Sequence, residues 1–276
     1  MGLFGFGKKK KVEEAPPKRT PVEKPVERHP MERIDENGQP VFESRLDKRS
    51  ILWEDHTICK SDFTSVFSSC LGKAFTVQMR MGRSVIGEET RLNLREGLVT
   101  IDNQHYPCGY IGLESEAENM WVWGWHEDQP LPNMILVKRM RRFGKAWGVH
   151  EFTEPVQEIT EQINGEHMAM VTCGLSATSV GFLPVPIDDG VVYVWICNMP
   201  TEVFAPADCS EFVENVMECI SEYPIDHSAF LRGYLYWNKT PYEWRGSDLV
   251  AHFAEGDVVF CLEDVDGKMR LKEIRK

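Results

Sequence analysis

Three tryptophans at every second position form the chain's most distinctive chemical pattern: Trp121, Trp123 and Trp125. Period-two alternation would place all three indoles on one face of a β-strand. Such a face offers flat apolar surfaces, each with one N–H donor, and would suit a planar ligand, a sugar or a protein partner. Aromatic residues on a central strand also commonly form the core, and the sequence leaves both interpretations open.

Two histidines beside carboxylates are the candidates for acid–base chemistry. His126 precedes Glu127 and Asp128, and His150 precedes Glu151. A neighbouring negative charge stabilises the imidazolium and moves its pKa toward the range useful to a general base. No nucleophile accompanies either histidine at a recognisable spacing, and the phosphate-loop, dinucleotide and zinc-protease motifs are absent from the sequence. The sequence therefore assigns no catalytic residue, no metal site and no cofactor.

A cluster of basic residues forms the third candidate site, within a helix predicted from Asn133 to Trp147. The cluster comprises Lys138, Arg139, Arg141, Arg142 and Lys145. Apolar residues recur at helical spacing on the other side of this segment. The basic side would attract an acidic protein or an anionic lipid. The alternative is a solvated face that pairs with the protein's own carboxylates.

The charge of the chain is unevenly distributed. The 276 residues carry a net charge of −12, but residues 1–50 hold 12 Lys and Arg against 9 Asp and Glu. The remaining residues therefore hold 19 basic against 34 acidic side chains, a net charge of −15. Because an acidic surface repels phosphate backbones, no nucleic-acid partner is expected. Another protein is the expected partner, and the oligomeric state stays open.

The first residues suggest a weak contact with a membrane surface. Leu3, Phe4 and Phe6 precede four lysines, Lys8, Lys9, Lys10 and Lys11. The aromatic and aliphatic side chains would insert into the bilayer interface while the lysines meet anionic headgroups. The segment that follows is rich in Pro, Glu, Lys and Arg, a composition typical of an extended linker. We therefore predict a disordered basic and Pro-rich tail and linker over 1–48.

The eight cysteines show neither a CxxC pair nor zinc-ligand spacing. Most lie within apolar runs, as Cys173 and Cys197 do, which is typical of buried free thiols in a reducing compartment. The apolar start precedes its lysines, the reverse of the order in a secretory signal. We therefore expect a cytoplasmic protein that can contact the inner membrane surface.

Hydrophobic periodicity and turn residues predict the elements that position these candidates. Helices are predicted over 63–72, 133–147 and 164–175, and after the capping residues Asp208 and Asp226. Strands are predicted over 75–81, 90–94, 98–101, 110–113, 120–126, 181–187, 191–199, 250–253, 258–262 and 269–274. Capping also explains the acidic residues beside His167 and His227 without chemistry.

The segment from Met120 to Met199 resembles an uncharacterised bacterial family known only as a domain of unknown function. The shared features are a W-x-W-x-W strand, Leu131-Pro132 with a helix after it, Phe143-Gly144, the segment Gly148 to Pro155 with the pattern G-[IV]-x-E-[FL]-T-x-P, an Ala-rich helix and a Gly-bounded apolar strand. The resemblance supports the fold and a bacterial origin, and it implies no activity.

Together these patterns predict an α+β fold, an antiparallel sheet with helices packed on one face. The α+β core with the Trp-rich strand is expected over 49–203. A helical and β-meander part is expected over 204–276, either packed on that core or within the same domain. The expected function is a non-catalytic binding or interaction protein with a flexible N-terminal tether. The alternative is an enzyme or small-ligand binder that uses Trp121, Trp123 and Trp125 with His126 or His150.

Overall fold

The computed structural model of the chain describes residues 58–87, 89–126 and 131–276. All of these lie within one compact unit. Its helices are α1 (Phe63–Ser84), α2 (Ile135–Trp147), η3 (His150–Phe152), α3 (Gly165–Gly174), η4 (Thr201–Phe204), α4 (Cys209–Glu222) and α5 (His227–Asn238). Its strands are β1 (Thr90–Asn93), β2 (Leu98–Ile101), β3 (Gln104–Ser115), β4 (Met120–Trp123), β5 (Val156–Glu158), β6 (Val180–Ile187), β7 (Gly190–Cys197), β8 (Tyr242–Arg245), β9 (Asp248–Phe253), β10 (Gly256–Val265) and β11 (Lys268–Arg275).

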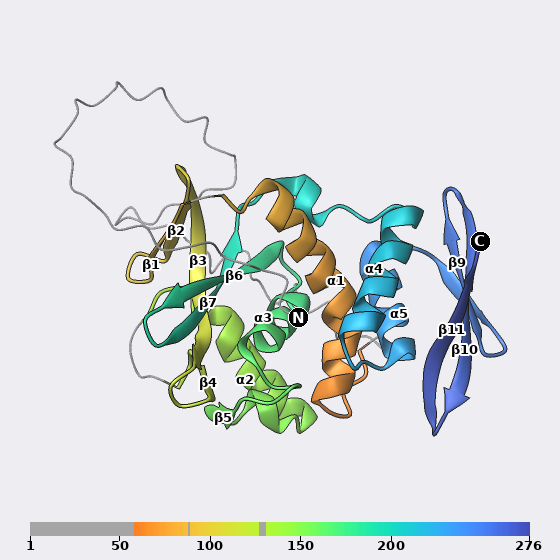
Figure 1. The fold of residues 1–276 in the computed structure, drawn as a ribbon, viewed down its shortest axis with the longest axis horizontal. Coiled ribbons are helices and arrows are strands. Elements are labelled where there is room, and N and C mark those ends of the chain that lie inside the picture. Colours follow the sequence, from red (N-terminus) through yellow and green to blue (C-terminus); the bar gives the residue numbers. More distant parts are fainter. Residues whose placement is uncertain (1–57, 88, 127–130) are drawn as a thin grey trace. The chain divides into compact units, whose positions relative to one another are not determined.

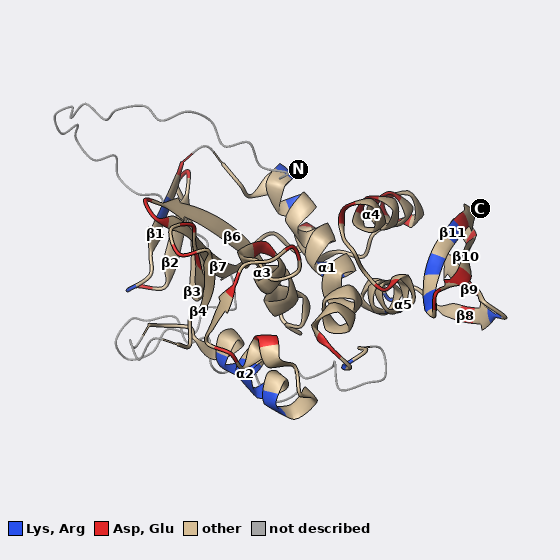
Figure 2. Ribbon diagram, turned by 60° about the horizontal axis from the view of Figure 1, so that its bottom comes forward, with Lys and Arg blue, Asp and Glu red and all other residues tan. Residues whose placement is uncertain are grey.

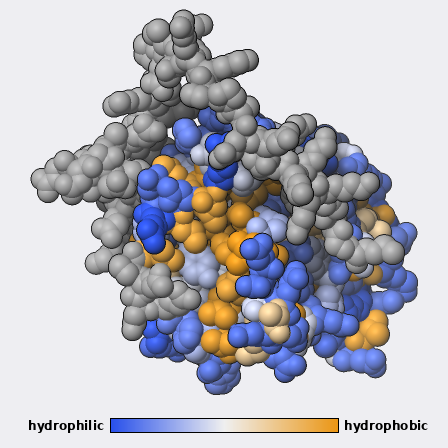
Figure 3. All heavy atoms as spheres, turned by 60° about the vertical axis from the view of Figure 1, so that its left-hand side comes forward, coloured by the Kyte–Doolittle hydropathy of each residue, from blue (hydrophilic) through white to orange (hydrophobic). Residues whose placement is uncertain are grey.

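The strands form two antiparallel sheets, so the predicted α+β class is confirmed (Figure 1). In the larger sheet β1 to β5 follow one another, and β7 joins the long strand β3 and carries β6 at the edge. The smaller sheet has the order β11-β10-β9-β8. Strands β3 and β7 contain runs of consecutive buried residues, so both of their faces are apolar. Figure 3 turns the side of the larger sheet forward and shows apolar residues gathered there.

Helix α1 corrects two of the sequence predictions. It runs through Gly72, where the predicted helix ended, and through 75–81, which was predicted as a strand. Apolar and polar residues alternate in 75–81. In a strand this alternation would place the apolar residues on one face and the polar residues on the other, toward solvent. Here Thr76 and Gln78 are buried, and each has a tertiary partner: Thr76 bonds the Tyr234 hydroxyl, and Gln78 exchanges two hydrogen bonds with the backbone of Phe182.

Four of the five predicted helix starts are confirmed by their caps, whereas α2 begins at Ile135, two residues after the predicted Asn133, and has no side-chain cap. The side chains of Asp62, Asn164, Asp208 and Asp226 each accept a hydrogen bond from the backbone N–H three residues later. These bonds satisfy N–H groups that have no partner within the helix. The capping box at Asp208 is only half formed, because the Glu211 side chain pairs with Arg80 instead of reaching back to the cap.

The Trp-rich strand is shorter than predicted. Strand β4 ends at Trp123, and Trp125 lies in the turn that follows. Four elements were not predicted from the sequence: η3, β5, η4 and β8. Edge strand β6 carries Pro184 and Pro186, which cannot donate to a further strand and so limit pairing at this edge.

Helix α1 packs against α3 and β6 and also against α4 and α5. It therefore joins the parts on either side of the boundary predicted near residue 203. That boundary itself stays a prediction. The predictions for the tail and linker over 1–48, including Leu3, Phe4, Phe6 and the lysines from Lys8 to Lys11, lie outside the described residues.

Candidate functional site

The Trp-rich strand is not a surface platform. Trp121 and Trp123 are fully buried, at 0% exposure, and their rings meet edge to face with centroids 5.4 Å apart. The Trp123 indole N–H donates to the carbonyl of Glu151 at 2.8 Å. Trp125 is half-buried beyond the strand end. The three indoles therefore do not form one accessible face, because the first two fill the space between the sheet and its helices.

The two histidines predicted beside this strand are both exposed, and they lie on different elements. His126 follows the turn after β4, and His150 begins η3. No hydrogen bond or ion pair joins either side chain to another described residue. Within the described part of the chain, neither histidine thus has a pocket or an orienting partner of the kind a general base requires.

The basic residues of α2 do gather on one exposed face. Lys138, Arg141, Arg142 and Lys145 are exposed, and Figure 2 shows this basic colouring along α2. The opposite side of the helix is buried and consists of Leu136, Val137, Met140 and Gly144. We call the four exposed residues the basic face of α2. Residues three and four apart are neighbours on a helix, so this face brings four positive charges together.

Arg139 is set apart from this face. It is half-buried, and burial together with the charge of Arg142 lowers the pKa of its guanidinium. The predicted helix is therefore present, with four of its five basic residues exposed on one side.

The charges of the basic face are not neutralised by the described part of the chain. Lys138, Arg142 and Lys145 form no ion pair with any residue that the structure describes. The Arg141 guanidinium lies 4.5 Å from the centre of the Trp125 ring, a cation–π contact. Like charges four apart destabilise a helix by about 0.2–0.5 kcal/mol per pair. Among the described residues, therefore, the face does not pair with the protein's own carboxylates, which was the alternative that the sequence left open.

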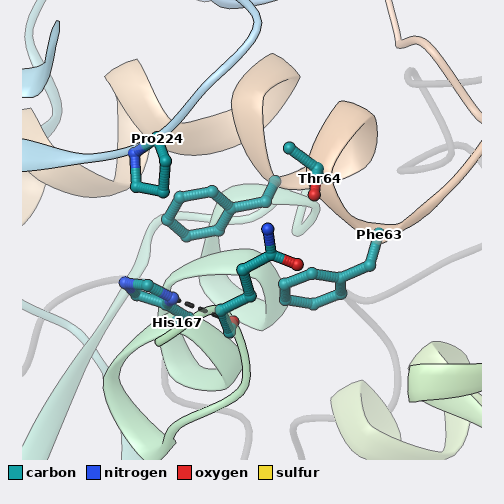
Figure 4. Close-up of a pocket in the computed structure, with 6 residues that line it drawn as sticks. Phe63, Thr64, His167 and Pro224 are labelled. Carbon is teal, nitrogen blue, oxygen red and sulfur yellow. Dashed lines mark hydrogen bonds between the residues drawn. The ribbon is translucent and has the colours of Figure 1, made fainter. Parts of the chain in front are cut away.

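A second feature, a small pocket, lies beside α1 and α3 (Figure 4). Its lining comprises Phe63, Thr64, Phe67, Gln162, His167 and Pro224. Its cavity has a volume of about 10 Å³, room for about one water molecule. Sequence reasoning missed this pocket. Helix capping explained only the acidic residue beside His167, and no sequence pattern links this histidine to phenylalanines about 100 residues earlier.

Next to His167, carboxylates gather at the start of α3. The Glu114 side chain accepts a hydrogen bond from the Gly165 N–H at 2.5 Å. Glu166 is half-buried, and the Tyr223 hydroxyl donates to it at 3.5 Å. Burial raises the pKa of Glu166, and the charges of Glu222 and Glu114 raise it further. The ionised form of Glu166 is therefore disfavoured in the folded protein.

Glu166→Gln is expected to stabilise the protein at pH 7, by on the order of 1 kcal/mol or less. A carboxyl group whose pKa is raised in the folded state destabilises the folded protein while it is ionised. As the pH falls through that pKa the group takes up a proton, and the destabilisation disappears. The gain of the variant should therefore shrink on acidification and vanish near pH 4 in thermal unfolding scans. Glu161→Gln removes the same charge from an exposed position and should change little. A gain for Glu166→Gln that persists in acid would contradict this explanation.

Other chemistry is limited in the part of the chain that the structure describes. No group of three or more His, Cys, Asp or Glu side chains there could hold a metal ion. No described helix combines the length and apolar character needed to cross a membrane. All eight cysteines are free thiols, and burial raises the pKa of Cys70, Cys108 and Cys173 to about 12. These three thiols are therefore poor nucleophiles at neutral pH.

Comparison with known proteins identifies a family without an assigned activity. Residues 64–199 match the family described as "Family of unknown function (DUF6882)". The match runs from α1 to the end of the larger sheet and leaves out α4, α5 and the smaller sheet. The predicted resemblance to an uncharacterised family is thereby confirmed. No curated protein and no solved structure matches the chain.

Proposed function

We propose that this chain is a non-catalytic binding protein of the bacterial cytoplasm that docks an acidic segment of another protein on the basic face of α2. The observation that carries the proposal is the set of four exposed positive charges, none of them with an ion-pair partner among the described residues, in a protein of net charge −12. Electrostatic complementarity of this kind steers encounter and selects partners by charge. Residues 1–48 would act as the tether.

A protein segment suits this face better than a membrane. A helix that binds a bilayer inserts its apolar side into the interface. The apolar side of α2 is instead buried against the rest of the fold, and only the basic side is open. Phe143 and Trp147 stack on each other with ring centroids 4.5 Å apart, and both are half-buried. Binding through this face would therefore depend on charge alone.

A short acidic segment also suits this face better than a nucleic acid. A duplex presents a charge about every 1.7 Å over a long distance and requires an extended basic surface. The basic face spans eight residues of one helix, from Lys138 to Lys145, which corresponds to about 11 Å. The acidic surroundings would repel a polyanion that extends beyond it. Free thiols at all eight cysteines agree with the proposed cytoplasmic location.

The test measures binding of a fluorescently labelled decaglutamate peptide to the full chain by fluorescence anisotropy. The double variant Lys138→Glu/Arg142→Glu should weaken binding at least about tenfold, since each reversal removes an attraction and adds a repulsion. The matched control is Arg91→Glu/Arg95→Glu, which changes the net charge equally at exposed positions on and beside β1. It should weaken binding less than about threefold.

Two further probes separate the alternatives. Vesicles of phosphatidylserine and phosphatidylcholine and a single-stranded oligonucleotide are titrated under the same salt conditions. Stronger binding of either probe than of the peptide, lost in the α2 variant, would replace the proposal with a membrane or nucleic-acid role. Equal losses in the α2 variant and the control would show that overall charge, and not this face, governs binding.

A further inference from the structure

His227 joins the start of α5 to β11, an edge strand of the smaller sheet. It is 6% exposed, and the backbone N–H of Leu271 in β11 donates to its Nδ1 at 2.8 Å. Its Nε2 lies 3.1 Å from Nη1 of Arg270, and the same Nη1 donates to the carbonyl of Ile225 at 2.9 Å. Both ring nitrogens therefore face groups of β11 that only donate hydrogen bonds.

An imidazole in this position fits only while it is neutral. The neutral ring has one bare nitrogen, which accepts the bond from Leu271, so its single proton lies on Nε2. The additional proton of the imidazolium would lie on Nδ1, against the Leu271 N–H, and would break that bond. It would also place a second positive charge beside the guanidinium of Arg270. Burial and this guanidinium both lower the pKa of His227.

The other elements around His227 do not neutralise an imidazolium. Helix α5 packs on α1 and on β11. The carboxylate of Asp226 favours the protonated ring, but its effect is smaller than that of burial or Arg270, and it caps α5 by accepting from the Ala229 N–H at 2.8 Å. On the α1 side the contact is uncharged, because the Ser68 hydroxyl accepts from the Asp226 N–H. No carboxylate forms an ion pair with Arg270 or His227 among the residues that the structure describes.

We propose that His227 makes the docking of β11 on α5 sensitive to acid, so that uptake of one proton by its ring releases the strand from the helix. Release would uncover the half-buried apolar side chains with which β11 contacts the core, namely Met269, Leu271 and Ile274. The protein would then present an apolar surface in acid that is covered at neutral pH. The inference does not depend on the role of the basic face of α2.

The test measures amide hydrogen exchange of the full chain by NMR at pH 7.5 and pH 5.5, corrected for the intrinsic effect of pH on exchange. In the released state the histidine has its ordinary pKa of 6.5. The opening equilibrium at the Leu271 amide should therefore rise up to about tenfold between the two pH values. His227→Asn keeps an acceptor for the Leu271 N–H and does not titrate, so this rise should be absent. His126→Asn makes the same replacement at an exposed position and should retain the rise.

The nitrogen chemical shifts of the His227 ring keep the test decisive if His227→Asn does not fold. In the parent chain they should place the proton on Nε2, and the ring should stay neutral at every pH at which the Leu271 amide is protected. The proposal is overturned if the ring takes up its second proton while that amide remains protected. It is also overturned if exchange at Leu271 does not rise in acid, or if a folded His227→Asn variant shows the same rise as the parent chain.

Discussion

Gly72→Ala and Gly82→Ala are expected to change the free energy of unfolding in opposite directions, although both replace glycine by alanine in α1. At Gly72 a Cβ would lie 2.6 Å from Cδ2 of Tyr234 and closer still to its Cβ and Cγ. Tyr234 cannot move aside, because its ring stacks on Phe212 at 4.0 Å and its hydroxyl bonds Thr76 and Asn215. Helices α1 and α5 would have to separate, at a cost of about 3 kcal/mol.

Gly82 is the matched control within the same helix. It is exposed, and a Cβ there would have no neighbour within 4 Å. Alanine should therefore stabilise the protein by about 0.5–1 kcal/mol through its higher helix propensity. Thermal and urea unfolding of the full chain measure both effects. Destabilisation of similar size by the two variants would mean that α1 does not approach α5 at Gly72.

Lys73→Met is expected to lower the free energy of unfolding by about 2–4 kcal/mol. Lys73 is 5% exposed, and its Nζ donates to the carbonyls of Cys173, at 3.1 Å, and of Ser176, with Gly174 at 3.5 Å. These carbonyls end α3, where the helix dipole favours a positive charge. Methionine fills a similar volume but donates no hydrogen bond to these carbonyls, and only that of Cys173 keeps a backbone donor, the N–H of Ser176.

The protonation of Lys73 supports this role at neutral pH. Burial lowers the pKa of Lys73 to about 8, so the ammonium group persists at pH 7. The ordinary pKa of a lysine, which applies in the unfolded chain, is 10.5. Between pH 8 and pH 10.5 the unfolded chain therefore holds this proton more readily than the folded chain. The contribution of Lys73 to stability therefore rises with pH across that window and is constant below it.

The control for Lys73→Met is Lys145→Met, which makes the same replacement at an exposed position of α2. Its effect on unfolding should stay within about 0.5 kcal/mol. Urea unfolding at pH 7 compares the two. A loss for Lys73→Met no larger than for the control would show that the end of α3 does not depend on this ammonium group.

Four helix starts could be predicted from sequence because they depend on local bonds, whereas the end of α1 could not. Asn164 and Asp226 cap their helices through hydrogen bonds that close within three residues. Turn residues such as Gly190 and hydrophobic periodicity are local as well, and most of the strands occur where they were predicted. The resemblance to an uncharacterised family also came from the sequence, and the match over 64–199 confirmed it.

The environment of each side chain was decided by the tertiary structure. The alternating segment within α1 is helical because partners far along the chain satisfy its polar residues, as Phe182 does for Gln78. Trp121 and Trp123 were candidates for a ligand face, but the structure buries both rings against each other, Tyr193 of β7 and Phe152 of η3.

The basic face of α2 could be predicted from the sequence alone, whereas the pocket at His167 depends on the tertiary structure. Four basic residues at helical spacing are a property of the sequence, and their prediction required only the helix. The pocket joins Phe67 of α1 to His167 of α3 and Pro224 beyond α4. Sequence periodicity reports which side of an element is apolar, but contacts between residues 50 to 160 positions apart depend on how the elements pack.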